Sequence, residues 1–133
     1  MRFVIALLLA VSLAPAGLRA QDSEIPNVIR DQISAFQADD FGAAFDYASP
    51  TIKRLFGTAE RFGQMVQNGY PMVYRPADVQ MLELRDMGAA RVQRVMIRDG
   101  GGRLHFLDYQ MVPSEDGWQI NGVQIVRAAQ VGA

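Results

Sequence analysis

Residues 89–127 read AARVQRVMIRDGGGRLHFLDYQMVPSEDGWQINGVQIVR and hold the clearest structural pattern in the chain. Three runs rich in Val, Ile, Phe, Tyr and Trp are separated by two turn-forming segments, 99–102 (DGGG) and 114–117 (SEDG). Runs of this composition with such separators are typical of neighbouring antiparallel strands joined by tight turns. The sequence therefore predicts a three-stranded antiparallel meander over these residues.

The segment before the meander predicts helices and one more strand. The spacing of three and four between apolar residues indicates an amphipathic first helix, with Ile25, Val28, Ile29, Ile33 and Phe36 on one face. Three shorter helices are expected to begin at Asp39 or Asp40, at Ser49-Pro50 and at Thr58, because such residues cap helix N-termini. Helices followed by antiparallel strands predict an α+β fold.

Two segments between the last predicted helix and the meander are less regular. Residues 70–77 contain two prolines and are expected to be irregular or a short edge strand, because proline cannot donate to a strand ladder. Residues 79–85 predict the first long strand of the sheet. The chain therefore predicts one α+β domain over residues 21–133.

The first twenty residues have the pattern of a secretory signal peptide. Arg2 precedes a run of twelve residues, 3–14, that is apolar except for Ser12, and small-residue sites follow at residues 14–16 (APA) and at Ala20. The apolar run is shorter than the roughly 20 residues of a membrane span, and no cysteine follows it for lipid attachment. We expect cleavage after Ala20, with the earlier small-residue site at residues 14–16 as the alternative. Export to the bacterial periplasm or the medium is expected, with no membrane attachment afterwards.

Composition restricts the function further. Cleavage would remove Arg2, Arg19 and no acidic residue, which leaves a net charge of about −3. A mildly acidic chain is poorly suited to neutralising phosphates, so no nucleic-acid partner is expected. With no cysteine and one histidine, neither a metal site nor another cofactor is expected.

The strand at residues 104–112 has an unusual pattern of faces. His105, Leu107, Tyr109 and Met111 share one face, and the other face is also largely apolar, with Leu104, Phe106, Asp108, Gln110 and Val112. A sheet with one solvated face alternates more cleanly between apolar and polar residues. We expect helices to cover one face and a loop or a second chain, in a homodimer, to cover the other.

The last strand changes parity near its middle. Trp118 and Ile120 share one face, whereas Val123 and Ile125 have the opposite parity. A β-bulge near Gly122 would restore one continuous inward face, because a bulge inserts a single extra residue.

The order of elements resembles the nuclear transport factor two-like (cystatin-like) superfamily over residues 25–127. The resemblance rests on the N-terminal helices, on residues 35–50 (AFQADDFGAAFDYASP) and on the last-strand motif 117–122 (GWQING). The chain is also similar to a small exported bacterial family known as a domain of unknown function. The resemblance implies helices packed in the concave face of a curved antiparallel sheet, but no particular activity, because this superfamily includes isomerases, dehydratases, transport factors and inactive partner domains.

Asp108 and the tyrosines are the first candidate site. A carboxylate in an apolar cavity would have a raised pKa, and Tyr74, Tyr109 or Tyr47 could donate to an oxyanion beside it. Steroid isomerases of the superfamily that the chain resembles carry a tyrosine on the first helix. The first helix of this chain has Phe36 and no tyrosine, so that motif is missing. We favour the interpretation that Asp108 pairs with an arginine across the sheet, such as Arg94.

His105 and the arginines of the first hairpin are weaker candidates. As a general base, His105 would need a cavity and a carboxylate or water in reach, so we favour a surface or interface histidine. Arg94 and Arg98 could clamp an anionic ligand. Pairing of the hairpin arginines with Asp86 and Asp99 on a solvated face is favoured instead.

No catalytic motif is identified, so two functions stay open. We favour a non-catalytic exported module that binds a small apolar or anionic ligand, or a protein partner such as a second copy of itself. The alternative is a cofactor-free isomerase, dehydratase or hydrolase that uses a cavity carboxylate. The candidate binding residues for a cavity are Tyr74, Asp108, Tyr109, His105 and Arg94.

Overall fold

The computed structural model describes residues 16–127, and its side chains are described from Glu24 onward. A long helix, α1 (Ala16–Gln37), is followed by four short ones: α2 (Phe41–Asp46), α3 (Pro50–Phe56), α4 (Ala59–Gly69) and α5 (Pro71–Tyr74). Four strands complete the domain: β1 (Pro76–Asp86), β2 (Arg91–Asp99), β3 (Leu104–Ser114) and β4 (Gly117–Val126). The predicted α+β class is confirmed.

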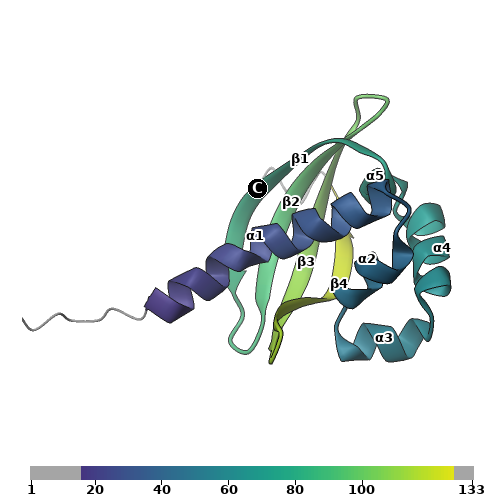
Figure 1. Cartoon of the computed structure of the whole chain (residues 1–133). Helices are drawn as coiled ribbons and strands as arrows, with labels where there is room; N and C mark the ends of the chain where they lie inside the picture. The colour runs from purple at the N-terminus through teal and green to yellow at the C-terminus, as the bar shows by residue number, and fades with distance from the viewer. Residues whose placement is uncertain (1–15, 128–133) are drawn as a thin grey trace, which may run out of the picture.

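The strands form one antiparallel sheet in the order β1-β2-β3-β4, which confirms the predicted meander. The sheet is curved, and α1 runs across one face of it, while α2, α3 and α4 gather beyond β4 (Figure 1). Ile29, Ile33 and Phe36 of α1 are 0–4% exposed, as the helical spacing predicts. Burying side chains of this size stabilises the fold by roughly 1.5–3 kcal/mol each before conformational entropy is counted.

The inner face of the sheet carries the core. Leu107, Tyr109 and Met111 are fully buried and face the helices together with Val95 and Ile97 of β2. The outer face carries the alternate residues of the same strands, most of them only half-buried. Helices thus cover one face, as expected, whereas a second chain on the outer face stays a prediction.

The predicted bulge in β4 lies at Asn121. The register steps from Gln110 opposite Gly122 to Met111 opposite Ile120, so Asn121 is the extra residue. The bulge puts Val123 on the same face as Trp118 and Ile120, where it packs against the core.

Two expectations about the helices need correction. Residues 71–74 form α5 and are not irregular, because Pro71 occupies its first turn, where the missing N–H is no loss. Pro76 and Ala77 begin the edge strand β1, which agrees with the other expectation for this segment. The first helix begins at Ala16 and so extends well before Ile25, the first residue of its predicted apolar face. The expected cleavage site after Ala20 falls within α1, and residues 1–15 of the expected signal peptide lie outside the described residues.

The shorter helices begin where their caps predict. Asp40 accepts a hydrogen bond from the Ala43 N–H, Ser49 from Ile52, and Thr58 from Arg61. These side chains satisfy backbone donors that have no partner within the helix. Short capped helices turn the chain sharply, and they place α3 and α4 at one end of the sheet.

Among the described residues, no helix is long and apolar enough to cross a membrane.

Candidate functional site

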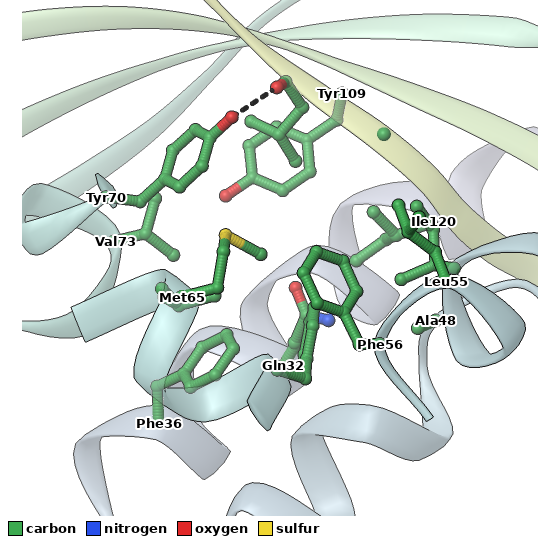
Figure 2. Close-up of a pocket in the computed structure, with 15 residues that line it drawn as sticks. Gln32, Phe36, Ala48, Leu55, Phe56, Met65, Tyr70, Val73, Tyr109 and Ile120 are labelled. Carbon is green, nitrogen blue, oxygen red and sulfur yellow. Dashed lines mark hydrogen bonds between the residues drawn. The ribbon is translucent and has the colours of Figure 1, made fainter. Parts of the chain in front are cut away.

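A cavity of about 230 Å³ lies between the helices and the strands β3 and β4. Its walls combine parts of the chain that are distant in sequence, from α1 to β4 (Figure 2). The lining is mostly apolar: Gln32, Phe36, Ala48, Ile52, Leu55, Phe56, Phe62, Met65, Val66, Tyr70, Val73, Tyr109, Ile120, Gly122 and Val123. A concave, mostly apolar pocket with few polar groups is the usual form of a small-molecule site.

Helix α3 forms an outer wall of the cavity. Ile52, Leu55 and Phe56 all line the space, yet none of the residues of α3 is buried. Leu55 is 71% exposed, so an apolar side chain lies between the cavity and solvent. The apolar face of α3 therefore borders the cavity, with Ile52 and Phe56 only partly buried against the core.

Tyr109 brings an unpaired polar group to the cavity. Its side chain comes from the middle of β3 and is fully buried, and its hydroxyl has no hydrogen-bond partner among the described residues. Figure 2 shows this hydroxyl pointing into the cavity, near Tyr70 and Met65. Buried hydroxyls in proteins nearly always have a partner, so this one is exceptional.

Burial, with a smaller contribution from nearby Tyr70, raises the pKa of the Tyr109 hydroxyl far above its usual value. An anionic phenolate would be poorly solvated in these surroundings. The group is therefore a neutral hydroxyl at physiological pH, able to donate one hydrogen bond and to accept others.

Two further polar side chains border the cavity. The Tyr70 hydroxyl donates to the Val123 carbonyl oxygen at 2.9 Å, which ties the end of α4 to β4. Gln32 is buried and donates its amide nitrogen to the Ala44 carbonyl oxygen at 3.0 Å. Figure 2 shows the Gln32 amide oxygen turned toward the cavity. The described lining contains no carboxylate, histidine, lysine or arginine.

Of the predicted binding residues, the structure places Tyr109 alone in the lining of this cavity. Tyr74 lies outside, where its hydroxyl bonds to Asp39 and its ring stacks with the Arg75 guanidinium 3.9 Å from the ring centre. Tyr74 therefore helps to hold the chain after α1 and does not face the cavity.

Asp108 and Arg94 lie opposite each other on the outer face of the sheet, as the favoured interpretation predicts. The Asp108 carboxylate accepts from Arg94 Nε at 2.9 Å and Nη2 at 3.0 Å, and from Arg85 Nη2 at 2.8 Å. The Arg94 guanidinium, aided by Arg85, holds the pKa of the Asp108 carboxyl below its usual value, although desolvation acts against them. The raised pKa of a cavity acid is thus wrong for Asp108, because the strand's alternation turns its side chain away from the helices.

His105 closes the β2–β3 hairpin. Its Nε2 lies 2.8 Å from Asp99 Oδ2, and Asp99 also accepts from the backbone N–H groups of Gly101 and Arg103. The His105 contact, followed by the Arg103 N–H, lowers the pKa of the Asp99 carboxyl. Asp99, which we expected to pair with an arginine, pairs with the histidine, whereas Arg91 pairs with Asp86 at 2.9 Å as expected.

Gln32 and Tyr70 border the cavity but were not among the predicted site residues. Gln32 had a recognisable signal, because it lies three residues after Ile29 and four before Phe36, on the apolar face of the helix. A polar residue on such a face indicates a buried hydrogen bond or a cavity. Tyr70 had no such signal, because its role depends on β4, 53 residues further along the chain.

The family model described as Domain of unknown function (DUF4864) matches residues 18–133. The chain belongs to this family. The match spans all the described elements except the first residues of α1, so the DUF4864 domain includes every wall of the cavity. No curated protein matches the chain.

The DUF4864 chain is also similar to a solved structure from Campylobacter jejuni described as a "Putative NTF2-like transpeptidase". The identity is 13% and the TM-score 0.51, over 73% of this chain and 97% of the other. At this identity the likeness shows the fold alone, and it confirms the predicted nuclear transport factor two-like architecture.

The described residues of this DUF4864 domain contain no cluster of three or more His, Cys, Asp or Glu side chains suited to a metal ion. The polar groups of the cavity are hydroxyls and an amide, which suit hydrogen bonding to a neutral molecule.

Proposed function

We propose that the protein is an exported, non-catalytic module that binds a small apolar ligand in the cavity between its helices and the strands β3 and β4. The observation that carries the proposal is the cavity of about 230 Å³, with its nearly continuous apolar lining. Removing apolar surface from water is favourable by roughly 25 cal/mol per Å², so such a cavity favours an apolar guest.

The proposal favours binding over catalysis for a chemical reason. Acid–base catalysis needs a titratable group within hydrogen-bond reach of the substrate. The described lining offers only two tyrosines and a glutamine as polar side chains, and the carboxylate predicted for a cavity enzyme lies on the opposite face of the sheet.

Export rests on the signal-peptide pattern of residues 1–20. N-terminal sequencing of the protein recovered from the periplasm or medium tests it. A chain that begins near Gln21 is the expected result, and an intact N-terminus in the cytoplasm would contradict the proposal.

A second copy of the chain is the protein partner that we propose, with the outer face of the sheet as the contact. Met96, Phe106 and Val112 are half-buried on this face, and Leu104 is 54% exposed. Arg94 and Asp108 lie among these residues and form an ion pair, so a dimer contact would bury their charges already paired with each other.

Toluene tests ligand binding, because apolar cavities of about 150 Å³ already bind benzene. In a ¹⁵N NMR titration of the exported form, residues 21–133, millimolar toluene should shift amide signals of α3, α4 and β4. Val66→Phe should abolish these shifts, because Val66 lines the cavity and a phenyl ring would fill part of it.

Val112→Phe is the matched control, because Val112 is half-buried on the outer face of the sheet. It should leave the toluene shifts unchanged. If toluene shifts no amide signal around the cavity, or shifts the same signals in Val66→Phe, the proposed function is wrong.

A further inference from the structure

We propose that the cavity selects neutral, apolar molecules that carry one hydrogen-bond acceptor oxygen, and that the Tyr109 hydroxyl is the donor to this oxygen. The inference rests on the proposed function and deepens it by naming the ligand class. Ketones, esters and ethers of modest size belong to this class.

The unpaired hydroxyl of Tyr109 is the first argument. The Tyr109 side chain is fully buried and belongs to the lining of the cavity, and its hydroxyl makes no hydrogen bond among the described residues. A buried donor without a partner is unfavourable, and phenylalanine would pack in β3 equally well without it. An acceptor oxygen on a bound ligand would supply the missing partner.

The other described polar groups support this assignment. The Tyr70 hydroxyl already donates to the Val123 carbonyl oxygen, and Gln32 donates its amide nitrogen to Ala44. Among the described side chains that line the cavity, the Tyr109 hydroxyl is the buried donor that makes no described hydrogen bond at all. One free donor in an apolar space matches one acceptor on an apolar molecule.

The absence of charge in the described lining argues for a neutral ligand. No arginine, lysine or histidine is among the described residues that line the cavity. Arg94, which the sequence suggested for an anionic ligand, is paired with Asp108 on the outer face. An anion placed here would lose its hydration without gaining a counter-charge. Tyr109 would offer it a single neutral hydrogen bond.

The volume limits the size of the ligand. Apolar cavities of about 150 Å³ accept benzene, with six non-hydrogen atoms, so a cavity of this size accommodates about nine. Acetophenone, α-methylstyrene and benzoate each have about that number and nearly the same shape. They differ in presenting a neutral acceptor, a hydrocarbon group and an anion, respectively, at the same position.

The test measures the dissociation constants of these three probes by NMR titration of residues 21–133. Each constant is measured for the unmodified protein and for the Tyr109→Phe variant. Tyr109→Phe should weaken acetophenone binding about 10-fold and change α-methylstyrene binding less than about 2-fold, because a hydrocarbon loses no hydrogen bond. Benzoate should bind the unmodified protein at least about 10-fold more weakly than acetophenone.

Tyr47→Phe is the matched control, because Tyr47 does not line the cavity. It should leave all three constants unchanged. Thermal unfolding without ligand provides a second readout, in which Tyr109→Phe should be as stable as the unmodified protein or more stable, since it loses no described hydrogen bond.

The outcomes separate the two proposals. If acetophenone and α-methylstyrene bind but Tyr109→Phe weakens both equally or neither, the ligand class is wrong and the cavity-binding function stands. Benzoate binding as tight as acetophenone binding would also overturn the neutral class. If none of the three binds, both proposals fail.

Discussion

At the scale of single residues, Asp108 shows how the alternation of side chains along a strand keeps a carboxylate out of the cavity. It is the neighbour of Tyr109, yet the two side chains lie on opposite faces of the sheet, one among arginines and one among apolar groups. Adjacent residues in a strand always diverge in this way. The pKa values shift accordingly: Arg94 lowers the pKa of the Asp108 carboxyl, and burial raises the pKa of the Tyr109 hydroxyl.

The Asp108 pairing predicts an acid-labile contribution to stability. A carboxyl whose folded pKa lies below its unfolded value stabilises the fold above about pH 4 and loses this contribution as the pH falls through the folded pKa. Asp108→Asn should lower the unfolding free energy at pH 7 by about 1–3 kcal/mol, because Arg94 is only 13% exposed and would lose its main partner. Urea denaturation at pH 7 and pH 3 measures both effects.

The difference in unfolding free energy between Asp108→Asn and the unmodified protein should be smaller at pH 3 than at pH 7. Asp78→Asn is the control, because Asp78 is exposed on β1, and it should change stability by less than about 0.5 kcal/mol at either pH. An Asp108→Asn protein as stable at pH 7 as the unmodified one would contradict the prediction.

At the scale of elements, the β4 bulge anchors the helix that walls the cavity. The Ser49 hydroxyl donates to Asn121 Oδ1 at 2.7 Å and accepts from the Ile52 N–H at 3.3 Å, so it caps α3 and holds it on the bulge residue. Backbone bonds between residues 47–49 and Ile120 reinforce the contact. The position of α3 is therefore set by β4.

Ser49→Ala should remove both hydrogen bonds of the hydroxyl and lower the unfolding free energy by about 2 kcal/mol. Thr58→Ala is the comparison, because Thr58 caps α4 at a more exposed site and makes a single cap bond at 3.2 Å. It should cost about 1 kcal/mol. Urea denaturation measures both variants, and equal losses would show that the Asn121 contact adds nothing.

At the scale of the whole molecule, the two faces of the sheet have different surroundings. The inner face meets the helices and borders the cavity, whereas the outer face carries half-buried apolar residues around a central ion pair. A specific protein–protein interface of standard size buries roughly 800 Å² per partner.

Sedimentation at micromolar concentration should show a dimer of residues 21–133. Phe106→Glu should give a monomer, because a carboxylate would be buried without a partner in the contact. Leu55→Glu is the control, because Leu55 is exposed on α3, away from the outer face of the sheet, and should remain dimeric. A strict monomer of the unmodified protein at tens of micromolar would exclude the proposed contact.

The elements themselves were predictable from the chain because their signals are local. Caps at Asp40, Ser49 and Thr58, the apolar spacing along α1 and the glycine-rich turns each act within a few residues, and the structure confirms them. The parity change in β4 also located the bulge, because alternation fixes which residues share a face.

The cavity was decided by the tertiary structure alone. Periodicity groups Tyr109 with Leu107 and Met111, and all three side chains pack in the core, yet Tyr109 also brings there a hydroxyl without a described hydrogen-bond partner. That difference arises because α3 and α4 meet β4 without filling the space between them, which depends on contacts as distant as Tyr70 with Val123. Local patterns determine which side chains face inward, and only the packing of distant elements determines where a space remains among them.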